Sequence, residues 1–127
     1  MNVGEALATL DALRPGSRVA PETRCRWLRE LDGTLRLRFF RKSSGAWESV
    51  GADLAQGDGR LSDDTVLLAP APFDALYPHY LCAMNDAALG ETDRYAGEQA
   101  QYNSILAELS AWLRREHPPC PGAQWRW

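Results

Sequence analysis

The side chains best suited to acid–base or metal chemistry in this sequence are two histidines, His79 and His117. His79 follows Pro78 in the first turn of a predicted helix, and His117 stands at the end of another. Neither has partners at the spacings that metal or acid–base sites use. A nucleophile elbow, a phosphate-binding glycine loop and a zinc-protease helix are also missing from the sequence. We therefore predict no catalytic residues, no bound metal, no cofactor and no enzymatic role.

Carboxylates in the glycine-rich segment 43–64 only partly match a calcium-binding loop. The segment carries Asp53, Asp58, Asp63 and Asp64, but it lacks the regular alternation of oxygen ligands and the closing glutamate. We interpret it as a long solvated loop with room for a short hairpin around residues 47–50.

A basic segment is the strongest chemical signal. Residues 14–42 hold nine basic and three acidic side chains, a net charge of +6, whereas residues 43–117 hold four basic and twelve acidic ones, a net charge of −8. Arginine dominates, and guanidinium groups suit planar pairing with carboxylates or phosphates. Three interpretations stay open: a solvated helix face, a subunit interface, or a channel wall that faces DNA. The candidate residues are Arg24, Arg26, Arg29, Arg36, Arg38, Arg41 and Lys42.

Helical periodicity organises the first third of the chain. Asn2 and Glu5 form a helix-start pattern before an apolar repeat that ends at Pro15. Pro21 suits the first turn of a second helix. That helix either continues to about residue 41 or stops near Gly33, because the residues that follow also alternate with period two, as in a strand.

Two further helices are predicted in the second half of the chain, after a possible short strand over residues 65–68. Asp74 is the expected N-cap of the third helix, and Gly90 supplies the left-handed residue that ends it. The last helix runs from about residue 91 to Glu116. The residues predicted to form the core are Trp27, Leu28, Leu31, Tyr80, Leu81, Met84, Tyr95, Tyr102, Leu109 and Trp112.

Length and composition fit one globular domain. The chain has 127 residues, of which 45% are hydrophobic and 24% charged. It contains no run of about 20 apolar residues, so we expect no membrane contact. Its three cysteines are widely spaced and are interpreted as reduced thiols, with Cys25 and Cys82 in the core. The sequence thus predicts a mainly α fold, a small bundle of about four helices over residues 1–117, and an extended aromatic tail over residues 118–127.

Short segments with a consistent order and spacing cover about three-quarters of the chain. They are Pro21–Thr23, Trp27–Gly33, Leu67–Tyr77, Tyr80–Asp86, Gly90–Glu91, Arg94–Tyr95, Asn103 and Ala111–Trp112. Together they resemble a family of small head–tail connector or adaptor proteins of tailed bacteriophages and prophages. The loop 43–64 and the chain from residue 118 onward lie outside the resemblance.

The resemblance implies a mostly helical subunit, without catalytic residues, that forms a ring beneath the portal protein of the filled capsid, commonly with twelve copies. Such a ring extends the DNA channel, can contact double-stranded DNA without reading its bases, and offers a surface to the next neck or tail-completion protein. The expected location is the virion, at the head–tail interface, after synthesis in the host cytoplasm. The resemblance also favours a continuous helix through Gly33.

The aromatic tail is the expected partner-docking element. Its candidate docking residues are Trp125, Arg126 and Trp127. The two indole rings cannot be buried within so short a segment, so we expect the tail to order on assembly and its truncation to weaken docking to the portal. The alternative function is a small helical DNA-binding regulator with the arginine-bearing helix in the major groove.

Overall fold

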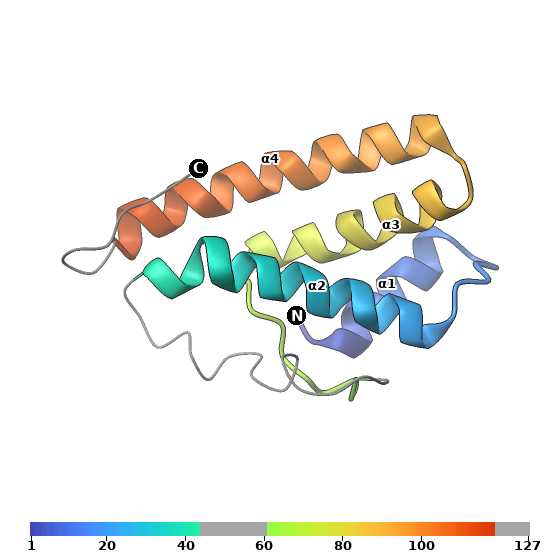
Figure 1. The fold of residues 1–127 in the computed structure, drawn as a ribbon, viewed down its shortest axis with the longest axis horizontal. Coiled ribbons are helices and arrows are strands. Elements are labelled where there is room, and N and C mark those ends of the chain that lie inside the picture. The colour runs from blue at the N-terminus through green and yellow to red at the C-terminus, as the bar shows by residue number, and fades with distance from the viewer. Residues whose placement is uncertain (44–60, 119–127) are drawn as a thin grey trace.

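The computed structural model describes residues 1–43 and 61–118. Within them lie four α-helices: α1 (Val3–Leu13), α2 (Pro21–Arg38), α3 (Leu76–Ala88) and α4 (Thr92–Glu116). Two 3-10 turns, η1 (Phe40–Lys42) and η3 (Phe73–Ala75), follow α2 and precede α3. The predicted mainly α fold, a small helical bundle, is confirmed for this part of the chain (Figure 1). The hairpin predicted around residues 47–50 lies outside the described residues.

The start and end of α1 follow the sequence signals. The Asn2 side chain accepts a hydrogen bond from the Glu5 backbone N–H at 2.8 Å, and the Glu5 carboxylate accepts one from the Asn2 N–H at 3.2 Å. These two bonds form a capping box. After the helix, Gly16 turns the chain with a φ of +78°, which glycine adopts without a Cβ penalty.

Helix α2 begins at Pro21 and runs through Gly33 to Arg38. The helical interpretation of this segment is therefore confirmed, and the strand interpretation is wrong. Leu28, Leu31 and Leu35 recur at spacings of three and four, and all three are buried. Burial of this helical stripe outweighs the local alternation of residues 35–39.

Residues 65–68 do not form the predicted strand. Their only β-sheet pairing within the described chain is an isolated antiparallel bridge between Asn2 and Val66. The chain turns into helix α1 directly after Asn2, so the pairing with Val66 does not continue in that direction as a ladder.

Asp74 does not cap α3, contrary to the sequence-based expectation. The turn η3 stands between the preceding loop and α3, and no side chain caps the helix start. The carboxylate of Asp74 instead lies 3.2 Å from the Met1 amino nitrogen. Gly90, with a φ of +76°, follows α3 in the left-handed conformation that the sequence predicts.

Helix α3 is the centre of the bundle. It runs antiparallel to α4 and also contacts α1 and α2 (Figure 1). Leu76, Tyr77 and Leu81 of α3 are fully buried. The two cysteines in the described residues, Cys25 and Cys82, are buried free thiols, and burial raises the pKa of Cys82 to about 11.

Most residues predicted for the core lie in it or against it. Those that are buried are Trp27, Leu28, Leu31, Leu81, Tyr102 and Leu109, and those that pack half-buried against the core are Tyr80, Met84 and Trp112. Tyr95 is the exception, with 36% of its surface exposed. Helix α4 packs mainly on α3 and η3, and Tyr95 lies in its first turn, near the end of the antiparallel contact with α3.

Gly4→Ala and Gly33→Ala are expected to change stability in opposite directions. A Cβ at Gly4 would lie 2.9 Å from the Cβ of Asp63, so the segment against α1 must shift, and the free energy of unfolding should fall by about 1–2 kcal/mol. A Cβ at Gly33 meets nothing within 4 Å, so alanine should raise it by about 0.5–1 kcal/mol. Urea unfolding of each variant measures whether its free energy of unfolding falls or rises relative to the parent. A Gly4→Ala protein at least as stable as the parent would contradict this packing of Asp63 on α1.

Candidate functional site

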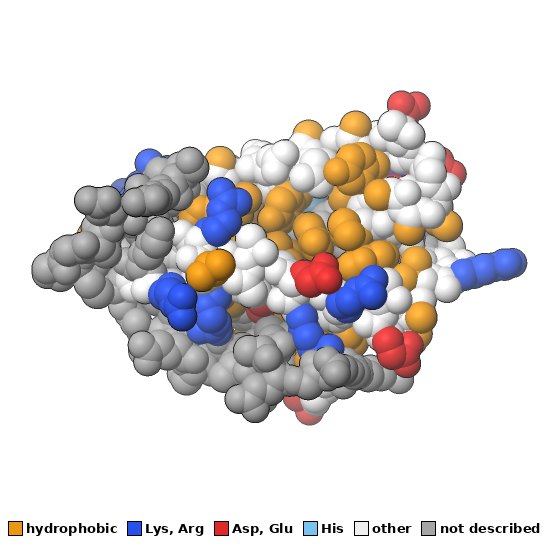
Figure 2. Space-filling model, in the orientation of Figure 1, with side chains coloured by type: hydrophobic (Ala, Val, Ile, Leu, Met, Phe, Trp, Pro, Cys, Tyr) orange, Lys and Arg blue, Asp and Glu red, His pale blue; other side chains and the backbone are white. Residues whose placement is uncertain are grey.

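Arginines of α2 and η1 form a basic face. We define it by Arg26, Arg29, Arg36, Arg38 and Arg41, of which the first, fourth and fifth are exposed and the other two half-buried. In Figure 2, Lys and Arg side chains gather where Figure 1 shows α2. The Arg26 guanidinium lies 3.8 Å from the Glu30 carboxylate, but both side chains are more than half exposed, so water weakens this pair. The exposed arginines of the basic face, Arg26, Arg38 and Arg41, are therefore accessible to an anionic partner.

Arg24 does not belong to the basic face, contrary to the sequence-based expectation. It lies at helical spacing from Leu28 and Leu31, on the core side of α2, and is only 8% exposed. Its Nη1 donates a hydrogen bond of 2.7 Å to Asp11 Oδ1, so it ties α2 to α1. The remaining predicted site residues have side chains outside the described part of the chain: Lys42, Trp125, Arg126 and Trp127.

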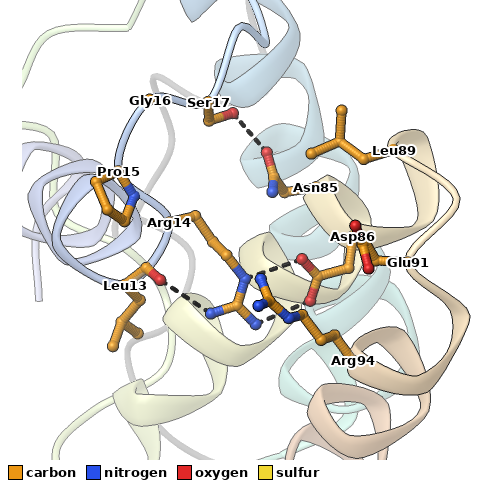
Figure 3. Close-up of a pocket in the computed structure, with 10 residues that line it drawn as sticks. All are labelled: Leu13, Arg14, Pro15, Gly16, Ser17, Asn85, Asp86, Leu89, Glu91 and Arg94. Atoms are coloured by element: carbon orange, nitrogen blue, oxygen red, sulfur yellow. Dashed lines mark hydrogen bonds and ion pairs between the residues drawn. The ribbon is translucent and has the colours of Figure 1, made fainter.

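A pocket of about 400 Å³ opens at the end of the bundle where α3 turns into α4 (Figure 3). Four segments line it: the end of α1, the link to α2, the end of α3 and the start of α4. The lining residues are Leu13, Arg14, Pro15, Gly16, Ser17, Asn85, Asp86, Leu89, Glu91 and Arg94. The sequence-based search missed this pocket, because its residues are separated by about 70 positions and form no local motif.

An ion network holds these segments together. Arg14 donates two hydrogen bonds of 2.9 Å, one to each carboxylate oxygen of Asp86, and its Nη2 lies 3.2 Å from Glu98. Glu98 also lies 2.6 Å from Nδ1 of His79. The hydrogen bond from Arg14 lowers the pKa of Asp86, and the same bond raises the pKa of Arg14. Both groups thus stay charged, and they fix the end of α1 against α3.

The groups around this network are suited to binding. Ser17 Oγ donates a hydrogen bond of 2.5 Å to Asn85 Oδ1, which closes one side of the pocket. Leu13 and Leu89 lie on opposite sides of the Arg14–Asp86 pair (Figure 3) and leave large apolar surfaces in water. Arg94 and Glu91 make no ion pair within the part of the chain that the structure describes. The pocket therefore offers apolar surface, one cation and one anion to a partner.

A second network is buried and joins α2 both to the segment before α3 and to Tyr77 in the first turn of α3. We call it the Asp32 clasp. The Leu68 N–H donates to one carboxylate oxygen of Asp32 at 3.0 Å, and the Tyr77 hydroxyl donates to the other at 2.6 Å. The Tyr77 oxygen also accepts the Ala69 N–H at 2.7 Å. Burial raises the pKa of Asp32 to about 6, although the hydrogen bonds from Tyr77 and Leu68 oppose the shift. The clasp fixes residues 67–77 on α2.

Comparison with known protein families, curated proteins and solved structures found no match to this chain. Among residues 1–43 and 61–118, no three His, Cys, Asp or Glu side chains are grouped so that they could hold a metal ion. None of the described helices is both long enough and apolar enough to cross a membrane. The features on which a function can be argued are thus the basic face, the pocket and the clasp.

Proposed function

We propose that this protein is a structural subunit of the head–tail junction of a tailed bacteriophage. Copies form a ring, with twelve as the expected number, below the portal protein of the filled head. The ring extends the DNA channel and receives the next neck or tail-completion protein. The subunit acts through contacts with its neighbours and carries out no chemical reaction.

The observation that carries the proposal is where the phage-like segments meet in the fold. Asp32 belongs to the segment Trp27–Gly33, while Leu68, Ala69 and Tyr77 belong to Leu67–Tyr77. The Asp32 clasp joins these two segments through two buried hydrogen bonds, and a third, from Ala69 to Tyr77, lies within the second segment. Because a buried carboxylate needs partners at fixed places, a fold built on this clasp constrains both segments at once. This supports the view that the resemblance reflects a shared fold.

The distribution of surface charge suits a ring. Glu5, Asp63 and Asp64 are exposed at the start of α1, where the Gly4 N–H donates to the Asp63 carbonyl at 3.0 Å. The basic face on α2 offers charge of the opposite sign. A ring needs two different surfaces of one subunit that fit each other, and opposite charges help to set that fit. Arginines that point inward instead would contact DNA phosphates without reading sequence.

Deletion of the gene from its phage or prophage tests the proposal. DNA-filled heads and finished tails should accumulate without joining, and a plasmid-borne copy should restore infectious particles. Normal yields of infectious, tailed particles from the deletion strain would contradict the proposal.

The alternative, a helical DNA-binding regulator, is supported by the basic face alone. Non-specific binding through a few arginines weakens steeply as salt rises. We therefore expect the free protein to leave a short DNA duplex unshifted in a gel at about 150 mM salt, where the salt dependence of phosphate contacts is already strong. A sequence-dependent shift that persists at this salt concentration, and that is lost in an Arg26→Gln, Arg38→Gln double variant, would favour the regulator.

A further inference from the structure

We infer that the pocket receives the aromatic segment 119–127 of a second copy of this chain, so that copies join head to tail. The inference rests on the proposed function as a ring-forming subunit. It assigns a role to a pocket and to a tail that the fold itself does not explain.

The apolar part of the pocket fits aromatic rings. Leu13 is 48% and Leu89 59% exposed, and the two lie on opposite sides of the Arg14–Asp86 pair (Figure 3). Pro15 adds a third apolar surface to the lining. Exposed apolar side chains at the rim of a pocket mark sites where a partner buries surface. The segment 119–127 carries two tryptophans, the residue type most enriched at the energetic centres of interfaces.

The charges of the pocket match the same segment. Arg14 pairs with Asp86 and Glu98, whereas Arg94, whose charge also acts on Asp86, and Glu91 have exposed side chains that an incoming chain can contact. The guanidinium of Arg126 can pair with the Glu91 carboxylate. The guanidinium of Arg94 can stack on an indole of Trp125 or Trp127. The segment 119–127 thus supplies a cation for Glu91, an aromatic ring for Arg94 and apolar surface for the leucines of the pocket.

The segment of the same copy cannot reach the pocket. Helix α4 has 25 residues and is therefore about 37 Å long, with the pocket at its first turn and residue 118 beyond its last. The nine residues 119–127 span at most about 32 Å when fully extended. The connection between α3 and α4, where the pocket opens, and the last turn of α4 lie at opposite ends of the molecule (Figure 1). The donor of the segment must therefore be another subunit.

A contact of this kind joins two different surfaces and leaves the pocket of the donor and the tail of the acceptor unoccupied. Such a heterologous contact repeats from copy to copy, and it closes into a ring when the rotation between copies divides a full turn. One repeated contact between tail and pocket is therefore enough to build the ring of the proposed function when that rotation closes.

Binding of a labelled tail peptide tests the inference. The probe is a fluorescein-labelled peptide of residues 118–127, kept under reducing conditions because it contains Cys120. The receptor is the full chain with Trp125→Ala and Trp127→Ala, so that its own tail does not compete. The pocket variant adds Leu13→Ser and Leu89→Ser, and the control adds Leu37→Ser and Val66→Ser, two side chains that are 59% and 56% exposed away from the pocket. Circular dichroism confirms that all receptors are folded.

We expect fluorescence anisotropy to show saturable binding to the receptor, at least about tenfold weaker binding to the pocket variant, and unchanged binding to the control. No binding to any receptor, or equal binding to all of them, would overturn the inference. Binding of the peptide to portal-bearing heads but not to this pocket would also overturn it, while leaving the proposed connector function in place. Failure of the connector function itself is detected separately, by the gene deletion.

Discussion

Replacement of Arg14 by Met is expected to lower the free energy of unfolding by about 3 kcal/mol, because it leaves the Asp86 carboxylate buried without its cation. Asp86 is only 1% exposed and receives both of its charge-assisted hydrogen bonds from Arg14. Methionine keeps most of the apolar stem, so the loss reports mainly the missing charge. Urea unfolding at neutral pH measures the difference.

Two matched variants accompany Arg14→Met. Arg26→Met removes an equally long cation from an exposed pair with Glu30 and should change the free energy of unfolding by less than about 0.5 kcal/mol. Adding Asp86→Asn to Arg14→Met removes the buried charge and should restore part of the loss. An Arg14→Met protein as stable as Arg26→Met would show that the ion network does not hold α1 against α3.

Because of the Asp32 clasp, part of the free energy of unfolding should depend on pH, and Asp32→Asn should remove this dependence. In the folded protein burial raises the pKa of Asp32 from its ordinary value of 3.8 to about 6. The folded state therefore binds this proton more tightly than the unfolded chain does. The stability that the carboxyl contributes is fully present below about pH 4 and is lost as the pH rises through 6. The shift of about two pH units corresponds to at most about 3 kcal/mol.

Unfolding by urea at pH 4, 5, 6 and 7 should resolve this dependence. The parent protein should lose up to about 3 kcal/mol relative to Asp32→Asn between the lowest and the highest of these pH values. Asp64→Asn, at an exposed position, is the control and should follow the parent. Profiles of the parent and Asp32→Asn that run parallel over the whole range would contradict a buried Asp32 with a raised pKa.

Local signals were enough to predict the helix ends that depend on neighbouring residues. The capping box of Asn2 and Glu5, the proline at the first position of α2 and the left-handed Gly90 each act within a few residues. The apolar stripe of α4 could also be predicted, because it repeats at helical spacings of three and four residues along the sequence. Periodicity could not decide between helix and strand after Gly33, because burial of Leu35 and Phe39 against other elements settles that question.

The features that were missed depend on contacts between distant segments. Arg14 and Asp86 are 72 positions apart, and Asp32 and Tyr77 are 45 apart. Asp32 and Gly33 together are typical of the end of a helix. Nothing in the neighbouring sequence indicates that the Asp32 carboxylate accepts a hydrogen bond from the distant Leu68 N–H. Arg24 looked like a surface arginine for a similar reason, since its partner Asp11 lies on another helix. The pocket combines four such segments and therefore has no signature in the sequence.

Immunogold labelling of purified phage particles, with an antibody raised against this chain, tests the proposed function most directly. If the protein is a connector subunit, gold should mark the junction between head and tail in filled, tailed particles, and the chain should be present in several copies per particle. Particles that lack the chain, or gold that is spread over the capsid or along the tail, would contradict it.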